Sequence, residues 1–306
     1  MNLKSLPING LSGEIICPGD KSISQRVLMI GSLLNCDIKI SGFLDAEDPN
    51  STMNALNNLG SLIKKDNDIV SINYRSKPFS NPSSFLDLGN SGTGMRLLTG
   101  FISGLNLEAT LIGDDSLSKR PMSRIVDPLT SMGKEISTNS GKAPIQIIGG
   151  NIKDNFEYVM PIASAQVKSS LMLASLSSGN SIKITEAKIT RDHTEKMIEY
   201  LGGSIEVSES SEGKVIFLKN SKLSKISTYE VVGDFSSAAF IIVAALISKN
   251  SEVLIKNVGL RFAVSNVITV ITIAAIINVC AIAVNPKNVI LPIHNENDVH
   301  HVHARI

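Results

Sequence analysis

The sequence predicts an α/β protein built from one repeated unit of helix, strand, helix and hairpin. Four apolar helices rich in small residues recur about 70 residues apart, and they begin at Ser22, Gly92, Ser164 and Asp234. A short alternating segment typical of a strand follows each of them. After the first three strands come an amphipathic helix and a hairpin pattern. We therefore expect a layered α/β body, with the small-residue helices buried and the amphipathic helices outside.

The first three units repeat the same signals in chain order. The small-residue helices are SISQRVLMIGSLL, GTGMRLLTGFISGL and SAQVKSSLMLASL, and the strands after them are DIKISGF, LEATLIGD and NSIKITEA. Each amphipathic helix stops at a glycine, a residue typical of helix C-termini because it adopts positive φ without strain. These glycines are Gly60, Gly133 and Gly202.

The fourth unit begins with DFSSAAFIIVAALI and SEVLIKNV, but the pattern is not continued after Leu260. An uncharged run, Ala263 to Val284, stands where an amphipathic helix is expected. Three interpretations stay open: a membrane anchor, since 22 residues can span a bilayer, a buried strand-rich segment, or a sequence that did not evolve with this fold, as after loss of a reading frame. The histidine-rich end (residues 294–303) could bind a metal ion, although a disordered tail is the simpler interpretation.

Composition excludes several classes of protein. The 306 residues are 43% hydrophobic, which is enough for about two domains with cores of their own. The net charge of +1 leaves no broad basic surface for nucleic acid. Three widely spaced cysteines, Cys17, Cys36 and Cys280, indicate reduced thiols in the cytoplasm. The first residues also lack the apolar core of a signal peptide.

The polar starts of the first three helices predict a site for anions. Helix N-termini present free N–H groups, and basic side chains lie within the first turns. Either Ser22 or Ser24 can cap the first helix. If the repeated helices point the same way, their starts line one surface. The residues at these starts are Lys21, Ser22 and Arg26 in the first unit, Asn90, Ser91, Gly92, Thr93 and Arg96 in the second, and Ser164, Ala165, Gln166 and Lys168 in the third.

Two further basic segments extend this set. The loop SLSKRPMSR carries Lys119, which we interpret as solvated, and Arg120, whose guanidinium can clamp a phosphate or carboxylate with two hydrogen bonds. Arg191 and His193 begin the third amphipathic helix; His193 is more simply a helix-start residue than an acid or base. The whole set predicts a small substrate that carries phosphate and carboxylate groups.

Six motifs in this order resemble the EPSP synthase family of 3-phosphoshikimate 1-carboxyvinyltransferases: PGDKSISQR, LGNSGTGMR, SLSKRPM, SAQVKSSL, TRDHTEKM and GDFSSAA. The resemblance covers about residues 1–260. It implies two domains of repeated βαβαββ units, arranged as an inside-out α/β barrel around buried helices. Residues 20–233 would form a complete inserted domain. Residues 1–19 and 234–306 would form an incomplete one, with residues 261–306 as an atypical tail.

The resemblance also implies a reaction, transfer of the enolpyruvyl group from phosphoenolpyruvate to shikimate 3-phosphate in chorismate and aromatic amino acid biosynthesis. It implies no metal or organic cofactor, and we expect a cytoplasmic monomer without nucleic-acid or membrane partners. Asn90 and Thr93 would shape the turn before the second helix. Residues matching the family's shikimate 3-phosphate site are Lys21, Ser22, Arg26, Ser164, Ala165, Gln166 and Arg191; those matching its phosphoenolpyruvate site are Lys21, Gly92, Arg120 and Gln166.

The catalytic acid and base stay unassigned. The family supplies them from a C-terminal half, and no matching pattern follows Leu260. Two alternatives to an active transferase are therefore kept. The chain is a substrate-binding fragment without turnover, or it belongs with the sister enolpyruvyl transferase that acts on a UDP-sugar.

Overall fold

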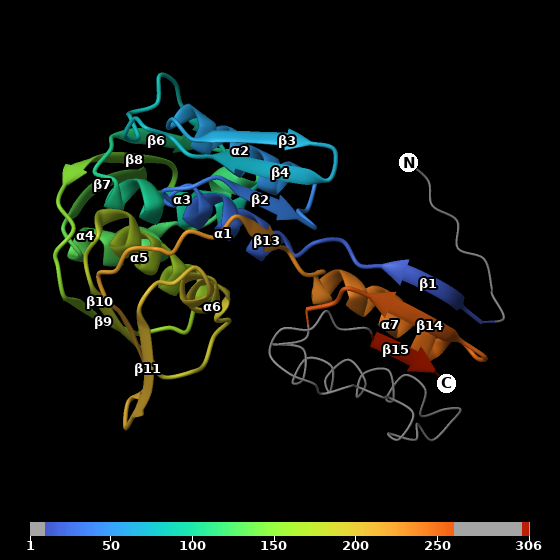
Figure 1. Cartoon of the computed structure of the whole chain (residues 1–306). Coiled ribbons are helices and arrows are strands. Elements are labelled where there is room, and N and C mark those ends of the chain that lie inside the picture. Colours follow the sequence, from blue (N-terminus) through green and yellow to red (C-terminus); the bar gives the residue numbers. More distant parts are fainter. Residues whose placement is uncertain (1–9, 260–301, 306) are drawn as a thin grey trace. The chain divides into compact units, whose positions relative to one another are not determined.

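The protein is described by a computed structural model that covers residues 10–259 and 302–305. It divides into two compact units (Figure 1). The central unit is Lys21–Glu230, and the split unit combines Met1–Asp20 with Val231–Ile306. No helix within the described residues has the length and hydropathy needed to cross a membrane. The uncharged run 263–284 and the histidine-rich end, apart from the backbone of its last strand, lie outside the described residues.

Three four-stranded sheets of one topology form the central unit. Each sheet has two neighbouring parallel strands followed by a hairpin that is antiparallel to the second of them. The three sheets, in spatial order, are β13 (Thr228–Glu230), β2 (Ile38–Ser41), β4 (Ile69–Asn73) and β3 (Leu62–Asp66); β5 (Leu86–Asp87), β6 (Ala109–Ile112), β8 (Lys142–Gly150) and β7 (Lys134–Asn139); β9 (Phe156–Met160), β10 (Ile182–Glu186), β12 (Gly213–Leu218) and β11 (Ile205–Ser210).

Six α-helices and one 3₁₀ turn connect these strands. Their positions confirm the predicted alternation of small-residue and amphipathic helices. They are α1 (Lys21–Gly31), α2 (Glu47–Asn58), α3 (Gly92–Gly104), η1 (Leu117–Lys119), α4 (Ser123–Ser131), α5 (Ala165–Ser178) and α6 (His193–Tyr200).

Strand β13 completes the first sheet, although it is the last strand of the central unit in the sequence. Its residues pair in parallel with β2, with Thr228 opposite Lys39 and Glu230 opposite Ser41. In the second and third sheets the corresponding strands, β5 and β9, directly precede the helix of their own repeat. The first sheet therefore has the same βαβαββ pattern as the others, but its first strand comes last in the chain.

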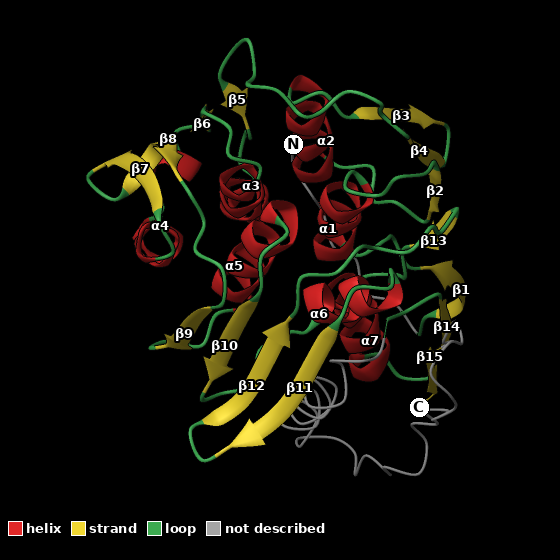
Figure 2. Cartoon of the chain, turned by 60° about the vertical axis from the view of Figure 1, so that its left-hand side comes forward, coloured by secondary structure: helices red, strands yellow, loops and turns green. Residues whose placement is uncertain are grey.

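The small-residue helices form the core of the central unit. Figure 2 shows α1, α3 and α5 side by side, with the three sheets around them. Helices α3 and α5 meet very closely, because a Cβ on Gly100 would lie 2.0 Å from the carbonyl oxygen of Ser170. Gly104 meets the carbonyl oxygen of Ala174 in the same way, at 2.1 Å. Small residues thus let two helix backbones touch. Most residues of α1, α3 and α5 are buried, which confirms the predicted inside position for the small-residue helices of the central unit.

The predicted glycine stops of the amphipathic helices are confirmed, whereas the predicted cap of the first helix is wrong. Gly60, Gly133 and Gly202 all have positive φ, of 102°, 114° and 81°, which confirms the predicted glycine stops. The prediction that Ser22 or Ser24 caps the first helix is wrong, because α1 begins at Lys21 and both serines lie inside it. The buried Ser24 hydroxyl instead accepts a hydrogen bond from the backbone N–H of Leu44 at 3.0 Å.

In the described residues, the split unit has one sheet and one helix. Strand β1 (Ser12–Ile16) runs parallel to β14 (Glu252–Lys256), and β15 (Val302–Arg305) runs antiparallel to β14. Helix α7 (Phe235–Ile247) is capped by Asp234, whose carboxylate accepts the N–H of Ser236 at 2.9 Å. A small apolar core joins helix and sheet; its buried residues are Cys17, Ala238, Ile242, Ala245, Leu246, Val253, Ile255 and Val258.

Candidate active site

The start of helix α3 is a tight, polar turn. Ser91 is fully buried and caps the helix, and its Oγ accepts the N–H of Gly94 at 3.1 Å. The Gln25 side chain of α1 donates to the same Oγ at 2.7 Å. A Cβ at position 94 would lie 2.7 Å from this Oγ, so the turn requires a glycine there. Within this turn the N–H of Gly92 donates to the carbonyl oxygen of Asn90 at 2.9 Å. The positive end of the helix dipole favours an anion beside the start of α3.

Two guanidinium groups converge on the first residue of α3. A Cβ on Gly92 would lie 2.9 Å from Nη1 of Arg120 and 3.2 Å from Nη1 of Arg96. Burial lowers the pKa of Arg96, and the neighbouring charges of Arg120 and Arg124 lower this pKa further. Two like charges beside a helix N-terminus repel each other unless an anion lies between them. This arrangement can bind a phosphate or carboxylate directly over Gly92.

The side chains around these arginines fix their directions. Arg120 donates to Oδ1 of Asn90, and Nδ2 of Asn90 donates to Asp114 at 2.7 Å. These contacts place Asn90 beside the turn, as the sequence predicted from its position.

The amide of Gln166, at the start of α5, is oriented by two contacts. Its Oε1 accepts a hydrogen bond from Nη1 of Arg96 at 3.0 Å, and its Nε2 donates to the hydroxyl of Thr93, also at 3.0 Å. The structure thus brings Gln166 to Thr93 and Arg96, although the two helix starts are far apart in sequence. Ser164 caps α5, and its Oγ accepts the N–H of Val167 at 3.4 Å.

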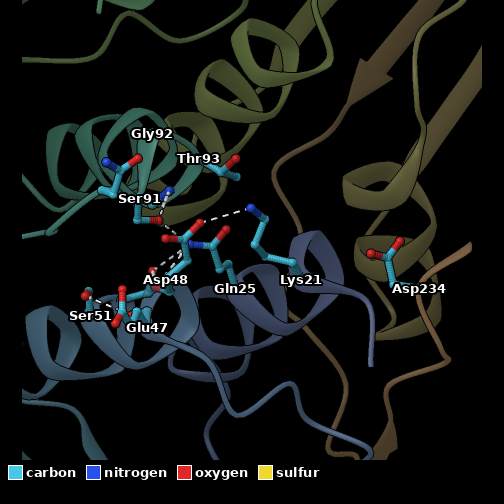
Figure 3. Close-up of polar contacts among 12 residues, drawn as sticks. Lys21, Gln25, Glu47, Asp48, Ser51, Ser91, Gly92, Thr93 and Asp234 are labelled. Atoms are coloured by element: carbon cyan, nitrogen blue, oxygen red, sulfur yellow. Dashed lines mark hydrogen bonds and ion pairs between the residues drawn. The ribbon is translucent and has the colours of Figure 1, made fainter. Parts of the chain in front are cut away.

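Lys21 lies at the start of α1, and its ammonium group meets a carboxylate. Its Nζ is 3.0 Å from Oδ2 of Asp48, in the first turn of α2 (Figure 3). Sequence reasoning missed Asp48. The available signal was the acidic pair Glu47 and Asp48 at the start of an amphipathic helix, which reads as ordinary compensation of the helix dipole.

Arg26 is buried, with 3% of its surface exposed. Its Nε donates to the Thr194 hydroxyl at 2.7 Å, its Nη2 to the Ser169 hydroxyl at 2.8 Å and its Nη1 to the carbonyl of Ser22 at 2.9 Å. The guanidinium therefore ties α1 to α5 and α6. Sequence reasoning placed Arg26 at the helix start but did not detect these internal partners.

Lys168 does not belong to the anion-binding surface on which the sequence placed it. The side chain is fully buried, and its Nζ lies 3.0 Å from Oε1 of Glu186 and 2.6 Å from Oε1 of Glu195. Burial raises the pKa of Glu195, an effect that the Lys168 ammonium opposes. Because a helix rotates by about 100° per residue, Lys168 faces the protein interior although it follows Gln166 closely.

Arg191 and His193 differ in their surroundings. Arg191 is exposed, in the loop between β10 and α6. The pKa of His193 is lowered to about 3, first by burial and then by the charges of Arg26, Arg191 and Lys168. This imidazole is therefore neutral at pH 7 and lacks the second ring proton that an imidazolium would donate as an acid. The interpretation of His193 as a helix-start residue fits its place as the first residue of α6.

Within the described residues, no group of three or more His, Cys, Asp or Glu side chains could hold a metal ion.

Comparison with known proteins identifies the relatives of this chain. A family model described as EPSP synthase (3-phosphoshikimate 1-carboxyvinyltransferase) matches residues 6–305, further toward the C-terminus than the six motifs reach. A relative with the enzyme name 3-phosphoshikimate 1-carboxyvinyltransferase from Petrotoga mobilis is 43% identical over 265 residues, which cover 85% of this chain and 61% of the relative. A relative of that name from Legionella pneumophila (strain Lens) is 41% identical, over 89% of this chain and 62% of its own length.

The solved structures agree. A solved structure named EPSP synthase, from Acinetobacter baumannii, superposes with a TM-score of 0.81 at 33% identity. The match covers 98% of this chain and 66% of that one. The present chain thus spans about three fifths of the length of the curated relatives it matches.

Proposed function

The chain belongs to the EPSP synthase family, and on this premise we propose that it binds shikimate 3-phosphate and phosphoenolpyruvate for enolpyruvyl transfer. The single observation that carries the proposal is the convergence of Arg96 and Arg120 over Gly92 at the start of α3. A site of this kind suits the phosphate or carboxylate of phosphoenolpyruvate. We assign Gly92, Arg120, Gln166 and Lys21 to this substrate.

We assign shikimate 3-phosphate to the neighbouring helix starts. Support comes from the exposed Lys21 and Arg191 and from the partly exposed helix starts at Ser22 and Ser164 to Gln166. Arg26 would attract this substrate through its buried positive charge, because hydrogen bonds hold its guanidinium beneath the start of α1. Lys21 would contact both substrates. The residues assigned to shikimate 3-phosphate are Lys21, Ser22, Arg26, Ser164, Ala165, Gln166 and Arg191.

In the proposed reaction, the 5-hydroxyl group of shikimate 3-phosphate gives up its proton to a base as its oxygen bonds to C2 of phosphoenolpyruvate, and the methylene carbon gains a proton from an acid. The C2–O bond to phosphate then breaks, the methyl group loses a proton, and the double bond re-forms. The products are 5-enolpyruvylshikimate 3-phosphate and inorganic phosphate. Each proton transfer needs a positioned acid or base, and the residues of the candidate site supply anion binding rather than these groups.

We propose that the chain is organised for this purpose as a complete inserted domain (residues 20–233) and an incomplete domain (residues 1–19 and 234–306). The free thiols of Cys17 and Cys36 support a cytoplasmic location, and we expect a monomer. Because the chain spans about three fifths of its relatives, substrate binding without turnover is the specific alternative for this chain by itself.

Calorimetric titration of the purified chain with shikimate 3-phosphate tests the proposal. We expect saturable 1:1 binding, and tighter binding of phosphoenolpyruvate in its presence. A UDP-sugar in place of shikimate 3-phosphate is the matched control, and binding of the UDP-sugar alone would assign the chain to the sister enzyme. Phosphate release from phosphoenolpyruvate only with shikimate 3-phosphate present would show turnover; binding without release identifies the chain as a substrate-binding fragment. Absence of binding by either acceptor would refute the proposed function.

A further inference from the structure

The ion pair of Lys21 and Asp48 connects the starts of two helices. Lys21 is the first residue of α1, Asp48 is the second of α2, and 3.0 Å separates Nζ from Oδ2. In Figure 3 the lysine side chain points from its helix toward Asp48, on the side of Ser91 and Gly92 at the start of α3. The carboxylate is thus the group that sets the direction of the Lys21 ammonium.

This pair contributes little to stability. The side chains are 49% and 22% exposed, for Lys21 and Asp48 respectively. Ion pairs this close to solvent contribute little to stability, because water screens the charges and the long lysine chain loses freedom. A lysine side chain without a partner samples many rotamers. The main consequence of the pair is therefore a restricted position for the ammonium group.

Asp48 is itself held in place by the network that caps α3. Its backbone carbonyl accepts hydrogen bonds from Nε2 of Gln25 at 3.3 Å and from the Thr52 hydroxyl at 3.1 Å. The same Nε2 donates to Oγ of Ser91, the cap of α3, at 2.7 Å. Lys21, Asp48 and the α3 cap are thus linked by fixed contacts among α1, α2 and α3, with Gln25 at their centre.

We propose that Asp48 is a positioning residue, which holds the Lys21 ammonium where an anionic substrate enters; this inference rests on the proposed function. An ammonium group has three donors, so Lys21 can keep one hydrogen bond to Asp48 and offer the others to phosphate or carboxylate. Asp48 has two opposing effects on such a ligand. Its negative charge repels the anion, whereas its hold on Lys21 favours binding, and the sign of a charge-removing substitution separates the two.

Glu47 provides a matched control. It carries the same charge in the same first turn of α2, and it is exposed. In the described residues its side chain has no ion pair with Lys21, and only its backbone carbonyl is engaged, by the Ser51 hydroxyl at 2.9 Å. Glu47→Gln therefore removes the long-range repulsion and leaves the position of Lys21 unchanged.

The test is calorimetric titration of variants of the whole 306-residue chain with shikimate 3-phosphate. We expect Asp48→Asn to weaken binding about fivefold, Asp48→Glu to restore part of the loss, and Glu47→Gln to leave binding unchanged or slightly tighter. In a Lys21→Met background, Asp48→Asn should cause no further loss and leave binding unchanged or slightly tighter, because the residue it positions is gone and only its repulsion of the anion is removed. Unchanged tyrosine circular dichroism would confirm that the variants are folded.

Three results would overturn the inference: equal or tighter binding by Asp48→Asn, an equal loss in Glu47→Gln, or the full loss persisting in the Lys21→Met background. If the unsubstituted chain does not bind shikimate 3-phosphate, the proposed function fails and the inference falls with it. If that chain binds and Asp48→Asn binds equally well, only the role of Asp48 is refuted.

Discussion

Helices α5 and α7 start alike but are buried to different extents. Both follow a side-chain cap, Ser164 in one and Asp234 in the other, and both are rich in small and apolar residues. In α5 every residue from 167 to 175 is buried, whereas only four residues of α7 are. Phe240, in the middle of α7, is 77% exposed.

The difference comes from the number of layers that pack against each helix. In the central unit, α5 contacts α3 and α4 as well as strands of its own repeat. In the described part of the split unit, α7 has one sheet to pack against, through Ala238, Ile242 and Leu246. A sequence repeat thus predicts a helix and its start, but the helix is buried all round only where neighbouring repeats supply the other faces.

The largest expected effect concerns the buried charge of α5. Lys168→Met should lower the free energy of unfolding of the central unit by about 3–5 kcal/mol, because Glu186 and Glu195 lose their buried counterion. Urea denaturation followed by tyrosine fluorescence measures this unit alone: the chain has no tryptophan, and all four tyrosines (residues 74, 158, 200 and 229) lie within residues 21–230.

Lys196→Met is the matched control for this substitution. Lys196 pairs with Glu199 on the exposed face of α6, with side-chain exposures of 46% and 59%. We expect a change of at most about 0.5 kcal/mol. Equal effects of Lys168→Met and Lys196→Met would show that the interior of the central unit tolerates unpaired charge.

A smaller effect is expected where α3 meets α5. Gly100→Ala would place a Cβ 2.0 Å from the backbone oxygen of Ser170, so the helices must separate. The cost should be about 2–3 kcal/mol of unfolding free energy, typical of overpacking, in the same tyrosine-monitored denaturation. Gly149→Ala, where the nearest atom lies 3.7 Å from the added Cβ, should change stability much less. Similar costs for both substitutions would contradict the close helix contact.

The smallest effect is expected on α7. Phe240→Ser removes a side chain that is mostly exposed, so we expect a change within about 0.5 kcal/mol. The thiol of Cys17 reports on the split unit, since it is buried and its pKa is raised to about 11, mainly by burial. In a background of Cys36→Ser and Cys280→Ser, its rate of modification should not change with Phe240→Ser.

Ile242→Ala gives the contrast within the same helix. Ile242 is buried in the apolar core that contains Cys17, so the substitution should loosen this core and speed thiol modification severalfold. If Phe240→Ser speeds the reaction as much as Ile242→Ala does, the exposed face of α7 is as important for the split unit as its core face.

The positions of residues around the candidate site followed from the sequence where backbone features define them, but not where side chains turn inward; their role in binding stays a prediction. Gly92, Thr93 and Asn90 are at the helix start where their turn pattern placed them, and Arg120 reaches them from its proline-containing loop. Lys168 and Arg26 also stand within the first two turns of a helix, yet both are buried and engaged by internal partners. Sequence spacing gives the angular position of a residue on its helix, but not which face has a neighbour.

The sequence by itself determined the helices, strands and hairpins of each repeat and the glycine stops, because helix caps, hydrophobic periodicity and positive φ depend on residues close together in the chain. Only the tertiary structure decided which strands pair. Strand β13 completes the sheet of β2, and β1 pairs with β14, more than 180 and 230 residues apart in the sequence. Such pairing depends on backbone hydrogen bonds that are available to any strand of suitable length. The partner of each strand is therefore selected by the packing of whole layers, and this packing cannot be predicted from a local sequence pattern.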